Sequence, residues 1–247
     1  MQDSDRILAL AQACDRIWTA DGGLDRARQL DLEPACHLGD NDSLSAAGLA
    51  YLEDRAIAQL KFPIKKDEPD SALALRHLLA AEYAWRQSRP HSNSLPRDRA
   101  PFKGPYSTLP GSLSGIIFLA GLGRRMDHVL ANLDLASRFV RPDLPFLLTD
   151  GQTDLWTLQG PCQLKLALPG GRRQDSYISL LAASPQVTGV NLQQVMWPLE
   201  GRKLFQGINL GISNQPLYGE AVELSLESGI LRVILTSEDK DQVKLQP

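Results

Sequence analysis

The sequence predicts an α/β fold: an N-terminal parallel sheet in a three-layer α/β/α domain, followed by an antiparallel β-sandwich or barrel. Up to about residue 150, short apolar runs alternate with helical patterns, which is typical of a parallel sheet covered on both faces. Beyond that point, polar and apolar residues alternate between turn signals, which is typical of antiparallel strands. We therefore expect one domain over residues 1–150 and a second over residues 151–247, with the boundary between Thr149 and Gly160.

The expected elements of the first domain follow in chain order. Strands are predicted at 17–20, 35–38, 59–63, 116–120 and 146–149, and helices at 6–14, 24–32, 44–57, 71–85 and 126–140. Ser43 is placed to cap the helix that begins at Leu44. Residues 88–115 hold five prolines and almost no apolar periodicity, which predicts a flexible surface insertion.

In the second half, alternating patterns predict strands at 163–168, 222–226 and 231–235. Turn signals at Pro169-Gly170-Gly171 and Ser228-Gly229 separate them.

The bulk composition favours a soluble cytoplasmic protein. Hydrophobic residues make up 43% of the chain, and the net charge of −3 gives no indication of the basic stripe that a nucleic-acid partner needs, so we expect no such partner. No signal-peptide pattern opens the chain, and the longest apolar run, 116–120, is too short to cross a bilayer. Three widely separated cysteines indicate a reducing compartment.

Acidic motifs dominate the first half. Asp21 lies in Ala-Asp-Gly-Gly, Asp40 and Asp42 lie in Gly-Asp-Asn-Asp-Ser, and Asp70 ends Lys-Asp-Glu-Pro-Asp. Most of them come at the expected carboxyl ends of strands, where ligands bind in parallel sheets. Like charges repel there unless a divalent cation that carries a polyphosphate lies among them. The motifs therefore predict phosphoryl-type chemistry.

Each acidic motif also has a purely structural interpretation. Asp40 and Asp42 face the same way if their segment is extended, so both can bind one Mg²⁺, but Asp42 or Ser43 can instead cap the next helix. Gly22 and Gly23 let backbone N–H groups approach an anion, or they form an ordinary turn.

The motif before the third long helix is equally ambiguous. Asp67 or Glu68 can cap that helix with Pro69 in its first turn, and Lys66 can neutralise a phosphate or remain solvated.

A glycine- and arginine-rich motif follows the strand at 116–120. In it, Arg125 can grip a phosphate bidentately beside Asp127. His128 and Asn132 share a helix face, and His128 is slightly better explained as a paired polar residue than as a catalytic one. The sequence contains neither a P-loop nor a dinucleotide-binding glycine motif.

A last motif, Gly211-Ile212-Ser213-Asn214, lies in the second half. Ser213 and Asn214 can hydrogen-bond an amino-pyrimidine edge, although both are common turn residues.

Taken in order, these motifs resemble the thiamin pyrophosphokinase (thiamin diphosphokinase) family, from Trp18 to Ser237. The resemblance implies an α/β catalytic domain that binds ATP and magnesium, and a β-sandwich that helps bind thiamin. It also implies a homodimer with active sites between subunits. The implied reaction moves the pyrophosphoryl group of ATP to the hydroxyl of thiamin, giving thiamin diphosphate and AMP.

The same resemblance implies roles for individual residues. Asp40, Asp42 and Asp70 would hold magnesium and the triphosphate, and Asp21 would join them. Arg125 and Asp127 would position phosphate and substrate, and either Asp70 or Asp127 would accept the hydroxyl proton. The remaining binding residues would be Gly22, Ser43 and Lys66 toward the nucleotide, and Asn132, Ser213 and Asn214 toward thiamin.

Two other functions remain open on the sequence. One is a pyrophosphokinase for another hydroxymethyl heterocycle, such as a pterin. The other is a non-catalytic protein that binds nucleotide or thiamin. Family members open with a further strand where this chain has a short helix, so we also expect the sheet to lack that strand.

Overall fold

The computed structural model describes residues 3–62, 70–87, 114–119, 121–123, 125–166, 176–217 and 221–237. Lys66, Asp67, Glu68 and residues 88–113 of the expected insertion lie outside the described residues. The chain divides into two compact units, residues 5–113 and residues 114–247 with 1–4. Parallel and antiparallel sheets are both present, so the predicted fold class is confirmed.

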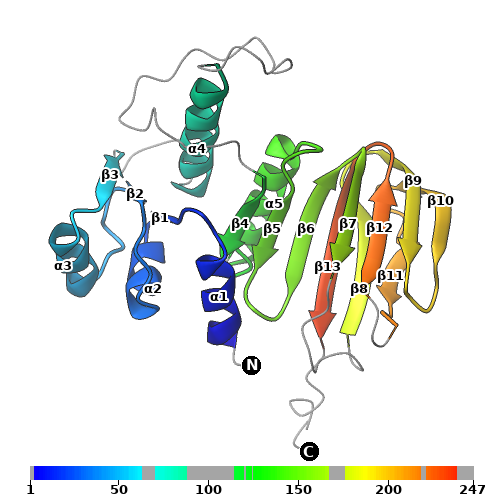
Figure 1. Cartoon of the computed structure of the whole chain (residues 1–247), viewed down its shortest axis with the longest axis horizontal. Coiled ribbons are helices and arrows are strands. Elements are labelled where there is room, and N and C mark those ends of the chain that lie inside the picture. The colour runs from blue at the N-terminus through cyan, green and yellow to red at the C-terminus, as the bar shows by residue number, and fades with distance from the viewer. Residues whose placement is uncertain are drawn as a thin grey trace, which may run out of the picture. The chain divides into compact units, whose positions relative to one another are not determined.

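A three-stranded parallel sheet organises the first unit (Figure 1). Its strands, in the order β1-β2-β3, are β1 (Trp18–Ala20), β2 (Cys36–Gly39) and β3 (Ala58–Lys61). The helices are α1 (Asp3–Gln12), α2 (Gly23–Gln29), α3 (Ala46–Asp54) and α4 (Asp70–Gln87). Helix α4 contacts β1 and β2, while α2 contacts β1 and α3. No strand occurs in residues 3–17, where α1 lies.

The start of α3 corrects one prediction. Its N-cap is Ser45 and not Ser43, because the Ser45 hydroxyl accepts from the Gly48 N–H at 3.0 Å. The same hydroxyl donates to the Asp25 carboxylate on α2, which also accepts from the Ser45 N–H at 2.8 Å. These bonds lower the pKa of Asp25 and join α2 to α3.

The second unit contains two sheets. Its elements are β4 (Ile116–Leu119), α5 (Met126–Phe139), β5 (Phe146–Thr149), β6 (Asp154–Gln159), β7 (Cys162–Leu166), β8 (Ser176–Ala182), β9 (Gln186–Gln193), β10 (Leu199–Phe205), β11 (Gly211–Asn214), β12 (Val222–Leu226) and β13 (Ile230–Ser237). A six-stranded sheet has the order β11-β8-β13-β6-β5-β4, and a four-stranded antiparallel sheet has the order β10-β9-β12-β7.

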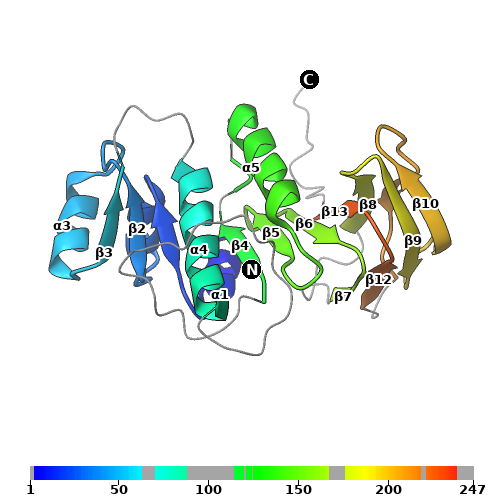
Figure 2. The same cartoon turned by 90° about the horizontal axis from the view of Figure 1, so that it is seen from above.

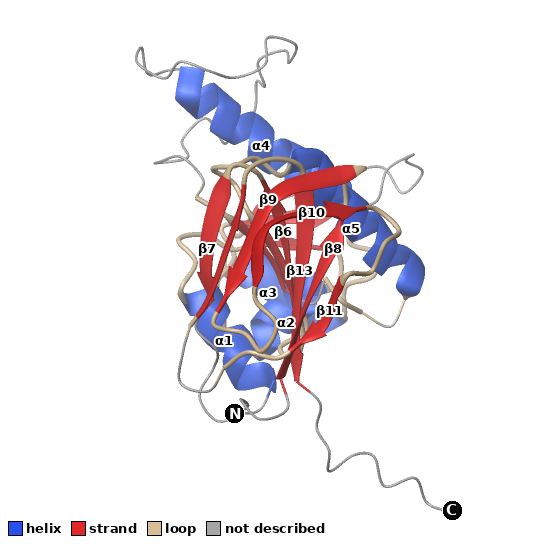
Figure 3. Ribbon diagram, turned by 90° about the vertical axis from the view of Figure 1, so that its right-hand side faces the viewer, coloured by secondary structure: helices blue, strands red, loops and turns tan. Residues whose placement is uncertain are grey.

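The two sheets form a sandwich around one apolar core (Figure 3). Ile178, Leu180, Leu231 and Val233 of the larger sheet pack with residues such as Val190 of the smaller sheet, and each is at most 2% exposed. The alternation of polar and apolar residues in the sequence therefore marks the face of each sheet that points into the core.

Strand pairing continues across the predicted domain boundary. β4 and β5 are parallel, as expected, but β5 also pairs antiparallel with β6. A short turn causes this, because the Asp150 carboxylate accepts from the Gln152 and Thr153 N–H groups and returns the chain beside β5. β4 and β5 therefore extend the sandwich sheet, and the boundary between Thr149 and Gly160 stays a prediction.

Helix α5 covers part of the larger sheet, where it contacts β6 (Figure 2). Arg232 on β13 donates to the Leu133 carbonyl and the Ser137 hydroxyl of α5, which ties the helix to the sandwich. In the described part of the chain, no helix combines the length and apolar character needed to cross a membrane.

Candidate functional site

The parallel register of β1 and β2 brings two acidic motifs to one edge of the sheet. Ala20 pairs with Leu38, and the Asp21 N–H donates to the Leu38 carbonyl at 3.1 Å. Gly39 has a φ of +146°, and a Cβ built on it would lie 2.9 Å from the Asp21 carboxylate oxygen Oδ1. The Asp21 carboxylate therefore packs directly against the residue that precedes Asp40.

The loop after β2 is not the extended segment that sequence reasoning assumed. β2 ends at Gly39, and Asn41 has a left-handed φ of +68°. Asp40 folds back, so that its Oδ1 accepts from the Asp42 N–H at 3.1 Å. Asp40 is half-buried, whereas Asp42 and Ser43 are exposed.

Three residues of the predicted motifs have backbone conformations that non-glycine residues seldom adopt. Asp21, Asn41 and Ser213 have φ values of +47°, +68° and +59°. Asp and Asn adopt this region more readily than most residues, since their short polar side chains bond locally. Such conformations often accompany functional sites, and here they follow or lie within strands at the predicted motifs.

Asp70 is electrostatically coupled to the same edge. It is the first residue of α4, the helix that contacts β1 and β2. Burial lowers the pKa of His37 on β2, while the hydrogen bond that the His37 ring donates to Asn41 and the negative charge of Asp70 act in the opposite direction. Asp70 therefore lies within electrostatic reach of the strand that carries the Asp40 loop.

The donor chemistry of this edge suits magnesium. Hard carboxylate oxygens are its preferred protein ligands, and with ATP it needs only one or two of them, the rest being water and phosphate. Within the described ranges, no group of three or more His, Cys, Asp or Glu side chains is close enough to hold a metal. The assignment of Asp40, Asp42 and Asp70 as ligands stays a prediction.

The arginine motif begins α5. Arg125 is its N-cap residue, and its Nη2 lies 2.6 Å from Asp127 Oδ2. Both side chains are more than 60% exposed, and the pair lowers the pKa of Asp127. With a carboxylate as its partner, the guanidinium has the planar geometry that also grips phosphate.

Asn132 has a structural role in the turn that follows β4. Its Nδ2 donates to the Gly121 carbonyl at 3.2 Å. A Cβ on Gly121 would approach Phe118 and Leu148 at 3.1–3.4 Å, so the turn is tightly packed. A contact from Asn132 to thiamin stays a prediction.

The Ser213-Asn214 motif lies on edge strand β11. Asn214 is 6% exposed, and its Oδ1 accepts from the Trp197 N–H at 3.0 Å while its Nδ2 donates to the Trp197 carbonyl. Ser213 is exposed, and its N–H donates to Ser179 Oγ at 3.0 Å. Asn214 thus fixes the backbone of Trp197, and Ser213 presents its hydroxyl to solvent.

Sequence reasoning missed Trp197. Its side chain is 56% exposed, which is unusual for so large an apolar group, and Asn214 holds its backbone beside the serine motif. The sequence signal is an aromatic residue next to Pro198 in the short apolar run 195–199, which looks like an ordinary buried segment and is too weak to predict a site.

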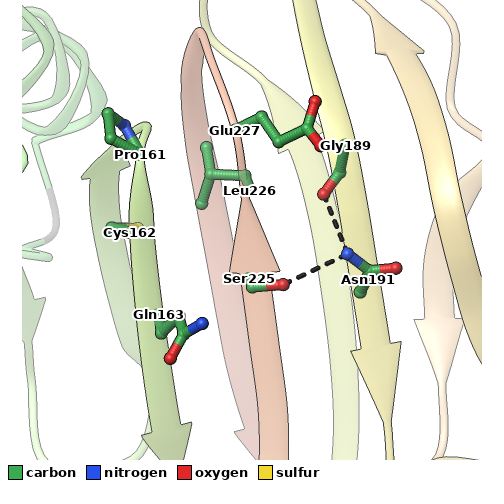
Figure 4. A pocket seen from close by; sticks show the side chains of 8 residues that line it. All are labelled: Pro161, Cys162, Gln163, Gly189, Asn191, Ser225, Leu226 and Glu227. Atoms are coloured by element: carbon green, nitrogen blue, oxygen red, sulfur yellow. Dashed lines mark hydrogen bonds between the residues drawn. The ribbon is translucent and has the colours of Figure 1, made fainter.

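An open hollow of about 430 Å³ lies on the smaller sheet (Figure 4). Its lining is Pro161, Cys162, Gln163, Gly189, Asn191, Ser225, Leu226 and Glu227. Asn191 bonds the Gly189 carbonyl and Ser225 Oγ across it, and burial raises the pKa of Cys162 to about 11, so that thiol stays protonated at neutral pH. None of the predicted site residues that the structure describes lines the hollow.

Two family models match the chain. The thiamin pyrophosphokinase catalytic domain matches residues 7–148, and the thiamin pyrophosphokinase vitamin B1 binding domain matches residues 165–231. No curated protein sequence matches significantly.

Solved structures share the fold at low sequence identity. Thiamine pyrophosphokinase from Bacillus subtilis is 21% identical with a TM-score of 0.70, and the alignment covers 94% of this chain and 92% of that one. Thiamin pyrophosphokinase from Geobacillus thermodenitrificans is 22% identical with a TM-score of 0.67, and the alignment covers 94% of this chain and 92% of that one. Thiamin pyrophosphokinase from Candida albicans is 15% identical with a TM-score of 0.67, and the alignment covers 94% of this chain and 84% of that one. Since the two family models span most of the sequence, the chain belongs to the thiamin pyrophosphokinase family.

Proposed function

We propose that the chain transfers the pyrophosphoryl group of ATP to the hydroxyl of thiamin, giving thiamin diphosphate and AMP. The observation that carries the proposal is the acidic edge of the first unit, where Asp21 packs against Gly39 and Asp40 follows directly. Family membership directs this edge toward ATP, and the match to the vitamin B1 binding domain directs the second unit toward thiamin.

Each group has a role that follows from its chemistry. Asp40 and Asp42, with Asp70, would hold magnesium, which when bound neutralises phosphate charge. Arg125 would exchange Asp127 for a phosphate, and Asp127 or Asp70 would then accept the proton of the thiamin hydroxyl. Ser213 and the exposed face of Trp197 would contact the thiamin heterocycle.

The decisive experiment measures AMP release from ATP. We expect AMP to appear only when thiamin and Mg²⁺ are both present, with thiamin diphosphate formed in equal amount. AMP release with a hydroxymethyl pterin but not with thiamin would identify a different substrate. Thiamin binding without AMP would identify a non-catalytic binding protein.

We further propose a homodimer with active sites between subunits. The arginine motif follows β4 and Ser213 lies on β11, which are opposite edges of the six-stranded sheet. At about 4.8 Å per strand spacing, five spacings separate these strands by roughly 24 Å, farther than one thiamin molecule reaches. Two copies of the chain would bring the two motifs to a shared substrate.

One stretch of the second unit, rich in exposed apolar side chains, supports the same proposal. The side chains that are large, apolar and 43–63% exposed between residues 196 and 217 are Met196, Trp197, Phe205, Ile208, Leu210, Ile212 and Leu217. Large apolar side chains that are exposed in one copy of a protein are often covered at an interface, so we propose that this stretch contacts the second copy.

Mixed dimers test this arrangement. We expect Arg125→Ala and Ser213→Lys to be nearly inactive alone, because one loses a phosphate contact and the other places a cation against cationic thiamin. If each site uses Arg125 of one subunit and Ser213 of the other, equal mixing after subunit exchange restores about a quarter of wild-type activity. Failure of properly exchanged mixtures to regain activity would contradict the shared site.

The cysteines bear on localisation. Cys14, Cys36 and Cys162 are all free thiols, as in proteins of reducing compartments, so we propose that the protein acts in the cytoplasm.

A further inference from the structure

A histidine lies inside the parallel sheet of the first unit. His37, on the central strand β2, is 1% exposed. Its Nδ1 lies 3.1 Å from Thr19 Oγ1 on β1, and its Nε2 lies 3.0 Å from Asn41 Oδ1 in the loop after β2. Both ring nitrogens are therefore paired, one toward a neighbouring strand and the other toward the acidic loop.

The direction of these bonds follows from the groups involved. The carbonyl oxygen of the Asn41 side chain only accepts, so Nε2 carries the proton and Nδ1 accepts from the Thr19 hydroxyl. Thr19 has a weaker alternative acceptor in the Cys36 carbonyl at 3.5 Å. Asn41 Nδ2 in turn donates to Gln59 Oε1 on β3 at a long 3.5 Å.

The neutral imidazole is the form that fits this arrangement. Burial holds the pKa of His37 below its ordinary value. A second proton, on Nδ1, would point at the Thr19 hydroxyl, which itself donates to Nδ1 in the neutral form. The hydroxyl would have to rotate away before its oxygen could accept that proton. The charged groups acting on His37 include Asp70 at the start of α4, which favours the cation but does not outweigh burial.

The hydrogen bonds that run from Thr19 through His37 to Asn41, called the relay below, end on the residue that separates the two aspartates. Asn41 is left-handed at φ +68°, a conformation that asparagine adopts more readily than most residues because its short polar side chain can bond locally. Two hydrogen bonds hold the backbone around Asn41. The Asp40 carboxylate accepts from the Asp42 N–H, and the Asn41 carbonyl accepts from the Leu44 N–H at 3.3 Å. Anchoring Asn41 to His37 therefore fixes how the chain passes from Asp40 to Asp42.

We propose that His37 is a positioning residue that, through Asn41, holds Asp40 and Asp42 in the arrangement that binds magnesium-bound nucleotide. The proposal rests on the proposed function for the identity of the ligand. Groups that orient metal ligands in this way typically change metal affinity by about 10- to 100-fold when they are removed.

The test measures the Kd of a non-hydrolysable ATP analogue in Mg²⁺ by calorimetry. We expect His37→Leu and Asn41→Gly each to raise this Kd about tenfold, since glycine keeps the left-handed backbone but removes the anchoring amide. The double variant is expected to be no weaker than either single variant, because both break one connection. His37→Gln, which keeps a donor toward Asn41, is expected to recover part of the affinity.

Two controls separate positioning from simple loss of stability. Val190→Ala removes part of a fully buried side chain from the sandwich core of the second unit, and should lower stability without changing the Kd. Nitrogen NMR of the imidazole should show a protonated Nε2 and an unprotonated Nδ1, and Asn41→Gly should shift the Nε2 signal.

Several outcomes would overturn the proposal. A Kd for His37→Leu within twofold of the wild-type value would leave the histidine as a core residue only, and an Nδ1-protonated ring would reverse the relay. Absence of Mg²⁺-dependent nucleotide binding by the wild-type chain would also overturn it. Nucleotide binding without thiamin-dependent AMP release would instead remove the proposed function and leave the relay intact.

Discussion

Replacing Asp40 by asparagine is expected to lower kcat/KM for thiamin-dependent AMP release on the order of 100-fold, about 2.7 kcal/mol of transition-state stabilisation. The substitution isolates charge from shape. Asparagine keeps an Oδ1 that can accept from the Asp42 N–H, so the loop retains its turn while the negative charge that attracts magnesium is lost.

The matched control for this variant is Asp54→Asn. Asp54 is exposed at the end of α3, and the substitution changes net charge by the same amount. We expect its kcat/KM to remain within about twofold of wild type, as for most surface substitutions. Activity of Asp40→Asn close to that of the control would remove Asp40 from the metal site.

Gly39→Ala is expected to lower the free energy of unfolding by about 1–3 kcal/mol and to weaken nucleotide binding as well. The new Cβ would lie 2.9 Å from the Asp21 carboxylate, and a φ of +146° is one that side chains rarely adopt. Relief of the clash moves Asp21 away from the Asp40 loop, so stability and binding should fall together. Denaturant unfolding and calorimetry measure the two effects.

Gly22→Ala provides the comparison for stability. Gly22 has a φ of −58°, and its added Cβ would meet nothing within 4 Å. We expect its free energy of unfolding to change by less than about 0.5 kcal/mol. Equal losses for the two glycines would show that close packing of Asp21 is not what Gly39 provides.

Local patterns predicted those features that depend on nearby residues. The strands that end just before Asp21 and Asp40 are predicted to within one residue at each end, because short apolar runs stop at glycine or aspartate. Parallel strands carry their carboxyl ends to one edge of the sheet, and this rule predicts that the acidic motifs lie near one another. The β1–β2 register agrees, because it places Asp21 beside Gly39.

Features that depend on distant partners could not be predicted in this way. Ser45 and not Ser43 caps α3 because Asp25, on another helix, holds it. The contact of Asn214 with thiamin stays a prediction, and no local pattern reveals that its side-chain amide bonds the Trp197 backbone. His37 lies in an apolar run whose sequence does not show that Thr19 and Asn41 flank its ring.

The hairpin of β5 and β6 has a practical consequence for anyone who wishes to express this chain as two fragments. A cut near residue 150 would separate two hydrogen-bonded strands and leave both with open edges, which favours aggregation. A cut after residue 113 keeps every described strand pair within one fragment. Fragments designed around that second position are the ones we expect to remain in solution.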